Sequence, residues 1–352
     1  MNAAITGLHY CLAPGRLTNE ELSHRFDARM VSTIAKMSGI SERRVAPAGV
    51  TASDLAFVAA TRLLDDRGVD PKDVDLLIFV SQTSDHQIPA TACSLHGRLG
   101  MGPHCAAFDI NLGCSGYPYS LAVVDGLMRS GVSRKALLLN ADTLTHVIHP
   151  RDRGLVPLHG DGAVATLLEP AREEGTGLRG SYLGTDGTGA PYLIIPASGA
   201  RKARTDETKR DLVDTSGSVR SEEHLAMNGP AVFHFSVYKV PEAVKEALAK
   251  FAVSLDDLDL VILHQANKMM MDLIYKALGI PAAKRFYFME TVGNMSGAST
   301  PMALAEATRV GRVKPSSLIL LVSFGVGLSW GISLIRWPEA GIAPVNGSVE
   351  FA

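Results

Sequence analysis

Hydrophobic and polar positions alternate along the first half of the chain in a way that predicts strands separated by helices. Apolar runs indicate strands at residues 3–8, 75–82, 107–112, 135–141 and 162–169. Residues 51–67 are expected to form a helix, and a second helix follows Cys114. In that second helix, apolar residues recur at the 3.6-residue period of one buried face: Leu121, Val124, Leu127 and Met128. Alternation of strands and helices is typical of layered α/β proteins.

The same pattern returns in the second half of the chain. Residues 70–79 resemble residues 254–263, and the strand at 135–141 resembles residues 317–323. Aligning the helices that end at Gly131 and Gly311 places Cys114 opposite Asn294. The sequence therefore predicts two copies of one α/β unit, residues 1–172 and residues 173–352. In the second copy we expect Pro241 to begin a helix over 241–251, because proline is favoured in a first helical turn.

The run from residue 317 to residue 337 is apolar enough to resemble a membrane span. It contains three glycines, at Gly325, Gly327 and Gly331, and has no flanking basic clusters. Glycines at these positions favour a turn between two strands. We therefore predict a β-hairpin here and no transmembrane helix.

Composition narrows the function classes. The chain has 352 residues, of which 46% are hydrophobic and 20% charged, as expected of a folded globular protein. A formal net charge of −2 gives no basic footprint for nucleic acid or anionic membranes. Four scattered cysteines do not form a disulfide framework, and the first residues lack the pattern of a signal peptide. These features predict a cytoplasmic protein.

A metal site is not expected either. Four residues have suitable side chains, but their spacing matches no compact zinc pattern: Cys93, His96, His104 and Cys105.

Cys114 is the first candidate for chemistry. Gly113 and Gly116 flank it, so backbone and substrate can approach closely. It stands where the predicted strand 107–112 gives way to a helix, and the positive end of a helix dipole favours a thiolate. Cys114 is therefore a candidate nucleophile; the alternative is a buried cysteine that acts as a small hydrophobic residue.

Two more polar residues occupy comparable turns. His264 directly follows the predicted strand 259–263, at the carboxyl end where α/β proteins bind ligands. Asn294 lies in a Gly/Ser-rich turn before another helix. Taken alone, His264 could be a core histidine and Asn294 a helix cap. Together with Cys114, they predict one reactive site at one edge of a duplicated sheet.

Several sequence motifs resemble those of one particular protein family. They are FDINLGCSGYPYSL around Cys114, PRDRGLVPLHGDGA over 150–163, LHQAN over 263–267, GNMSGAS over 293–299 and SFGVGLSWG over 323–331. In these motifs and their order the chain resembles the β-ketoacyl-acyl carrier protein synthase III family of the thiolase superfamily. The resemblance implies a duplicated five-layer αβαβα fold and a homodimer.

The resemblance also implies a mechanism. Cys114 would take an acyl group from a thioester, and backbone N–H groups of Cys114 and near Val326 would bind the oxyanion. His264 and Asn294 would then donate hydrogen bonds to a malonyl thioester on acyl carrier protein as it loses carbon dioxide. The product would be a 3-oxoacyl chain of fatty acid biosynthesis. The substrates are acyl-CoA or acyl-carrier-protein thioesters, and no further cofactor is expected.

Residues around this set are assigned through the same resemblance. Phe324 corresponds to an aromatic residue beside the cysteine pocket, and Ile88 to a large residue that crosses the dimer to close the acyl pocket. An aliphatic Ile88 predicts a primer longer or bulkier than acetyl. Candidates for binding the substrate or its carrier are Arg153, Asn267, Lys268 and Lys276.

The chain departs from the family at the nucleotide clamp. Thr33 and Met37 stand where the family's best-known members have a tryptophan and an arginine that hold CoA, and Arg153 alone remains. The loss of these two residues is expected to weaken the binding of CoA, which favours a carrier protein as the acyl donor.

Residues 198–223 form a longer and more charged segment than is typical of the family. Its basic residues are interspersed with acids, which favours a solvated loop; a lid or a docking site for an acidic carrier protein are the alternatives.

Two other functions stay open at this point. One is an acyltransferase of secondary metabolism that uses the same Cys–His–Asn set on a different acceptor. The other is a non-catalytic partner subunit, which would have no chemical reason to keep Cys114, His264 and Asn294 together.

Overall fold

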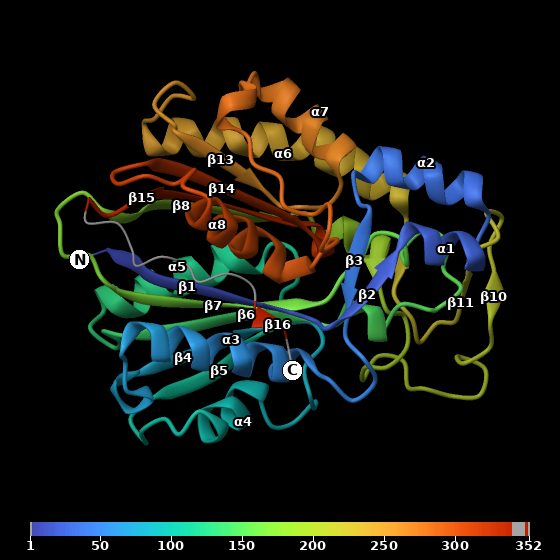
Figure 1. Ribbon diagram of the computed structural model, residues 1–352, viewed down its shortest axis with the longest axis horizontal. Helices are drawn as coiled ribbons and strands as arrows, with labels where there is room; N and C mark the ends of the chain where they lie inside the picture. Colours follow the sequence, from blue (N-terminus) through green and yellow to red (C-terminus); the bar gives the residue numbers. More distant parts are fainter. Residues whose placement is uncertain (1, 340–348, 351–352) are drawn as a thin grey trace.

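The computed structural model describes residues 2–339 and 349–350, which form five alternating layers of helices and sheets (Figure 1). A six-stranded sheet has the strand order β16-β1-β7-β6-β4-β5. Its strands are β1 (Ala3–Leu12), β4 (Leu76–Val80), β5 (Ala106–Ile110), β6 (Ala136–Asp142), β7 (Gly162–Pro170) and β16 (Val349–Glu350). A four-stranded sheet has the order β13-β14-β15-β8. Its strands are β8 (Gly177–Thr185), β13 (Leu260–Leu263), β14 (Leu318–Gly325) and β15 (Ser329–Arg336).

The two sheets repeat one topology. In the first, β4 and β6 are parallel, whereas β6–β7 and β7–β1 are antiparallel. In the second, β13 and β14 are parallel, whereas β14–β15 and β15–β8 are antiparallel. The strands β4, β6, β7 and β1 thus correspond to β13, β14, β15 and β8, and the duplicated five-layer fold expected from the sequence is confirmed. The expected division at residue 172 falls between β7 and β8, and remains a prediction.

Helices separate and cover the sheets (Figure 1). The helices α3 (Ala52–Arg67) and α4 (Thr91–Arg98) cover the outer face of the first sheet, and α6 (Gly229–Phe251) and α7 (Lys268–Leu278) cover the second. Between the sheets lie α5 (Gly116–Arg129) and α8 (Ser299–Arg309), which contact strands of both. Burial on both faces explains why β4 and the first residues of β6 and β14 read as apolar runs.

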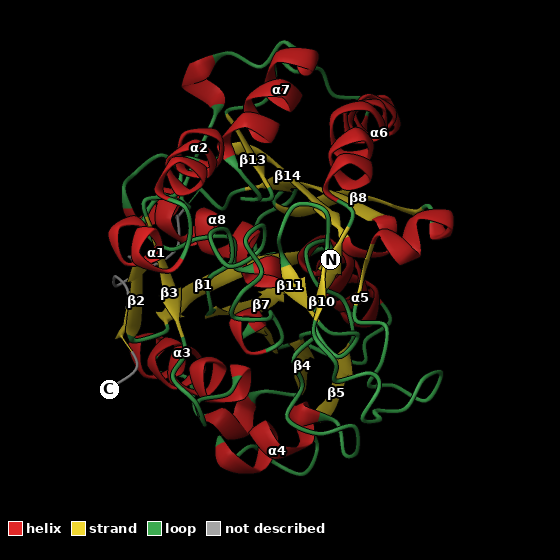
Figure 2. Cartoon of the chain, turned by 90° about the vertical axis from the view of Figure 1, so that its right-hand side faces the viewer, coloured by secondary structure: helices red, strands yellow, loops and turns green. Residues whose placement is uncertain are grey.

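Shorter elements gather at one end of the layers, which faces the viewer in Figure 2. They are β2 (Gly15–Thr18), α1 (Asn19–Arg25), α2 (Ala28–Ser38), β3 (Glu42–Val45), β9 (Leu193–Ile194), β10 (Leu212–Val213), β11 (Val219–Arg220) and β12 (Ala226–Met227). β9 and β12 form a two-stranded antiparallel ribbon. Residues 198–223 lie between these two strands and form a long excursion of the chain whose two ends meet at the ribbon.

The predicted hairpin at 317–337 is confirmed, since β14 and β15 pair antiparallel around a short turn. None of the helices in the described ranges combines the length and apolarity needed to cross a bilayer.

The expected helix start at Pro241 is wrong, because α6 begins at Gly229 and passes through Pro241. Pro230 occupies the first turn instead, and the Asn228 side chain caps it by accepting the Ala231 N–H. Proline has no N–H to donate, so one helical hydrogen bond is missing at this position. Buried residues on both sides of Pro241, including Val240 and Val244, keep the helix continuous there. Tertiary packing therefore outweighs the local cost of an interior proline.

Candidate active site

Cys114, His264 and Asn294 line one cavity of about 400 Å³. Cys114 lies between β5 and α5, His264 directly follows β13, and Asn294 precedes α8. The rest of the lining is mostly apolar and includes residues from α6, α7, β9, β12 and β14: Met37, Leu158, His159, Leu193, Met227, Gly229, Pro230, Val232, Phe233, Ser236, Ala266, Asn267, Met269, Met270, Phe324 and Gly325. Three turns far apart in the sequence thus open into one space, as the duplication predicts.

The end of β14 lies directly against the cysteine. A Cβ atom at Gly325 would come within 2.5 Å of the Cys114 Cβ and 2.7 Å of its Sγ, so this contact requires glycine. Burial raises the pKa of the Cys114 thiol, while the Val326 backbone N–H and the Ser296 hydroxyl, 3.9 Å from Sγ, counteract this shift. Loss of solvation thus opposes the stabilisation of the thiolate that the helix end is expected to provide, and the role of Cys114 as nucleophile stays a prediction.

His264 is held in a fixed orientation. Its Nδ1 lies 2.6 Å from the Ser299 Oγ, and its ring meets the Phe324 ring edge-on, with centroids 5.6 Å apart. Burial, with a smaller contribution from the nearby His159 imidazole, lowers the pKa of His264 to about 3. The imidazole is consequently neutral throughout the physiological pH range, and Nε2 is the ring nitrogen left for a ligand.

Asn294 is fixed through its backbone and one side-chain atom. Its N–H donates to the Leu158 carbonyl at 2.8 Å, and its carbonyl accepts from the Gly160 N–H at 3.0 Å. Its Oδ1 accepts the Ser296 N–H at 3.0 Å. The amide group Nδ2 remains as a donor toward the cavity. The site therefore combines a thiol with two neutral groups that can donate hydrogen bonds.

Replacing Ser299 by alanine is expected to slow any step that depends on the His264 hydrogen bond about tenfold, the size of one good hydrogen bond. Without the hydroxyl, Nδ1 loses its partner and the imidazole is no longer held in one tautomer and rotamer. Single-turnover condensation kinetics measure the effect, and acylation of Cys114 is the internal control. Equal slowing of both steps would show that Ser299 acts only on the packing of the site.

The other predicted residues are spread over the surface and the cavity. Asn267 lines the cavity, but its Oδ1 caps α7 by accepting the Met270 N–H at 2.8 Å. Lys268 is exposed and pairs with Asp272 at 2.6 Å, and Lys276 is exposed on the same helix. These lysines lie outside the cavity lining.

Ile88 and Arg153 also lie away from the cavity lining. Ile88 is 88% exposed, so its proposed place in a partner's pocket remains a prediction. The Arg153 Nη1 donates to the Ser216 carbonyl at 2.8 Å, and its Nε approaches the Met30 sulfur at 3.3 Å. The guanidinium is thus already engaged by the chain itself.

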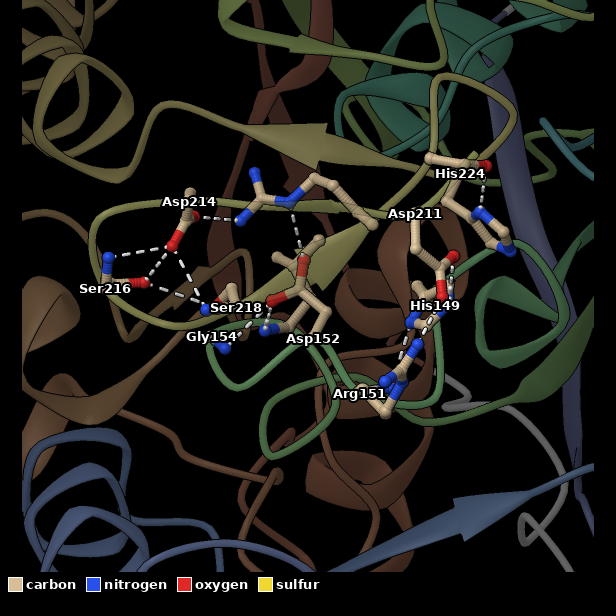
Figure 3. Close-up of polar contacts among 12 residues, drawn as sticks. His149, Arg151, Asp152, Gly154, Asp211, Asp214, Ser216, Ser218 and His224 are labelled. Atoms are coloured by element: carbon tan, nitrogen blue, oxygen red, sulfur yellow. Dashed lines mark hydrogen bonds and ion pairs between the residues drawn. The ribbon is translucent and has the colours of Figure 1, made fainter. Parts of the chain in front are cut away.

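Residues 198–223 are largely exposed, but two ion-pair clusters anchor them to the loop before β7 (Figure 3). Arg220 pairs with Asp152 at 3.2 Å and with Asp214 at 2.8 Å. Asp211 pairs with Arg151 and lies 3.2 Å from His149. A purely solvated loop is therefore too simple a description of this excursion.

Replacing Arg220 by alanine is expected to lower the free energy of unfolding by about 3 kcal/mol, because the Asp152 carboxylate is fully buried and would lose its counter-charge. Denaturant unfolding measures the change. The matched control is Arg204→Ala, which breaks a more exposed pair with Glu223 and should cost below about 1 kcal/mol. Similar losses in both variants would contradict a special role of the buried pair.

Two polar residues of the site were not singled out from the sequence. His159 and Ser299 both stand inside quoted motifs, in LHGDGA and GNMSGAS, but nothing local distinguishes them from structural residues. Across the described ranges, no group of three or more His, Cys, Asp or Glu side chains is arranged to hold a metal ion.

Comparison with known proteins identifies the relatives of this chain. Family models described as 3-oxoacyl-[acyl-carrier-protein (ACP)] synthase III and its C-terminal part match residues 108–187 and 248–337. A beta-ketoacyl-[acyl-carrier-protein] synthase III from Caldanaerobacter subterraneus is 38% identical over 333 residues, covering 93% of this chain and 97% of that protein. The counterpart from Rhodopirellula baltica is 37% identical over 322 residues, covering 86% and 90%.

Solved structures agree. A crystal structure of a 3-oxoacyl-(acyl-carrier-protein) synthase III superposes with a TM-score of 0.93 at 38% identity, covering 96% of this chain and 100% of that one. A 3-oxoacyl-(acyl-carrier protein) synthase from Burkholderia xenovorans gives a TM-score of 0.89 at 33% identity, covering 100% and 97%. The chain therefore belongs to the β-ketoacyl-acyl carrier protein synthase III family.

Proposed function

We propose that this condensing enzyme of fatty acid biosynthesis joins an acyl primer, held on Cys114, to a malonyl group delivered by acyl carrier protein. The observation that carries the proposal is the convergence of Cys114, His264 and Asn294 on one largely apolar cavity. A thiol supplies the nucleophile, and two neutral donors suit a carbonyl oxygen on which negative charge develops.

The first half-reaction transfers the acyl group. The Cys114 sulfur attacks the thioester carbonyl as its proton passes to the departing thiol, and the carbon–sulfur bond to the donor breaks. The Val326 N–H donates to the cysteine sulfur, which supports its proposed role as an oxyanion donor together with the Cys114 N–H. Burial raises the pKa of the thiol, which supports a proton transfer that accompanies the attack on the thioester.

The second half-reaction forms the carbon–carbon bond. With Nδ1 accepting from the Ser299 hydroxyl, His264 carries its proton on Nε2 and donates to the malonyl thioester carbonyl alongside Asn294 Nδ2. The bond to the carboxylate breaks, carbon dioxide leaves, and the enolate carbon attacks the acyl group. The sulfur of Cys114 departs and the 3-oxoacyl product remains on its carrier.

The same reasoning supports several further assignments. A carrier-protein primer is favoured over CoA, because Arg153 is engaged by Ser216 and Met30. The chemistry needs no cofactor beyond the thioesters, and a cytoplasmic homodimer in which Ile88 reaches the partner's acyl pocket remains part of the proposal.

The test uses malonyl-acyl carrier protein labelled in its free carboxyl group. The expected result is release of labelled carbon dioxide that requires a Cys114-bound acyl group and matches the 3-oxoacyl product in amount. Acyl transfer to a hydroxyl acceptor without carbon dioxide would instead indicate an acyltransferase. Absence of any acyl-enzyme with acyl-CoA and acyl-carrier-protein donors would contradict both.

A further inference from the structure

The catalytic cavity contains a second histidine that the reaction described above does not use. His159 lines the cavity together with Cys114, His264 and Asn294, and its imidazole is close enough to lower the pKa of His264. It pairs with Asn294 through a parallel β-bridge, which ties its position to that of a proposed donor. The ring also lines a neighbouring cavity of about 370 Å³, so it stands between the two spaces.

The tautomer of His159 follows from its contacts. Nδ1 lies 3.2 Å from the Leu155 carbonyl oxygen, which can only accept, so Nδ1 must carry the proton. Burial lowers the pKa of His159, so the ring is neutral and Nε2 presents a lone pair. No residue in the described ranges donates a hydrogen bond to Nε2.

Other polar groups of the lining are already engaged. Ser236 donates its hydroxyl to the Val232 carbonyl, and the Asn267 Oδ1 caps α7. His264 and Asn294 present donors. Within the described part of the chain, the side-chain hydrogen bond of the Cys114 sulfur is to Ser296 and not to His159. The lone pair of His159 is therefore available for a donor that arrives with the substrate.

We propose that His159 is a specificity-determining residue that accepts a hydrogen bond from the amide N–H in the carrier arm of the thioester substrate. The inference rests on the proposed function, because that function supplies a substrate whose sulfur continues into an amide-bearing arm. His264 and Asn294 would donate to the thioester carbonyl on one side of the sulfur, and His159 would accept from the arm on the other. The substrate would thus be oriented on both sides of its sulfur. A thioester without the N–H would leave Nε2 desolvated and unpaired.

The test compares two small acyl donors, an acyl-N-acetylcysteamine thioester and its N-methyl amide analogue, which lacks the N–H. Thiol release and the mass of Cys114 report acylation. The native enzyme is expected to prefer the N–H donor about tenfold in kcat/KM. In His159→Phe this preference should fall to near unity, mainly through KM, whereas His159→Gln, which retains an acceptor oxygen, should keep much of it.

Leu158→Met is the matched control, since it changes the same cavity wall without removing a polar group, and should leave the preference intact. An equal rate for both donors in the native enzyme would overturn the proposal whether or not the variants fold. An unchanged preference for the N–H donor in His159→Phe would also overturn it. That result would mean that Nε2 faces the neighbouring cavity instead of the substrate. Failure of the proposed function would look different, because Cys114 would then gain no acyl mass from either donor.

Discussion

Replacing Cys114 by alanine is expected to abolish the acyl-enzyme and to reduce condensation at least about 10³-fold, since the described cavity lining contains no second thiol to hold the acyl chain. Intact-protein mass after mixing with an acyl thioester measures the first effect, and 3-oxoacyl product formation the second. Folding should survive, because the substitution removes one sulfur atom from a site that already contains open space.

Cys93 provides the control for this experiment. It is an exposed free cysteine, and Cys93→Ala should acylate and condense like the unaltered protein. If Cys114→Ala still gained the mass of the acyl group, another residue would have to be the nucleophile. Because burial raises the pKa of the Cys114 thiol, its alkylation by iodoacetamide should continue to accelerate as the pH rises beyond 9.

Replacing His264 by alanine is expected to slow condensation about 10²–10³-fold while Cys114 still takes the acyl group, since in the proposed mechanism the imidazole donates only to the developing enolate. Asn294→Ala should have a similar effect. Rapid-mixing experiments that load the acyl group first and add malonyl-acyl carrier protein second separate the two steps. Loss of acylation in both variants would contradict this division of labour.

The pH dependence gives an independent check. The pKa of His264 is about 3, so the donor is neutral above that pH and becomes a cation only below it. The pH profile of the condensation rate should therefore contain no transition near pH 6.5 that is due to His264. Any transition seen there in the unaltered enzyme should also be present in His264→Ala. A transition that His264→Ala removes would mean that the imidazole titrates in the working enzyme.

Much of the fold could be predicted because the buried strands and the hairpin have strong local patterns. The relation between Cys114 and Asn294 could also be predicted, since both occupy the same turn of a repeated unit. The start of α6 could not, because packing around Pro241 decides it. The raised pKa of Cys114 and the lone pair of His159 depend on burial and on a distant carbonyl, and a sequence motif displays neither.

The ribbon of β9 and β12 determines where the chain can tolerate changes in length. Leu193 pairs with Met227 across this ribbon, and both side chains line the cavity. The outer part of the excursion, around β10 and β11, extends from that closed base and is held separately by the ion pairs of Asp211 and Arg220 with the loop before β7. Insertions or deletions in this outer part, away from the residues that form those ion pairs, should therefore be neutral for catalysis, while a single added residue at either end of the β9–β12 ribbon would deform the cavity that binds the substrate. Homologues are accordingly expected to vary in length in the outer part and to keep the base constant.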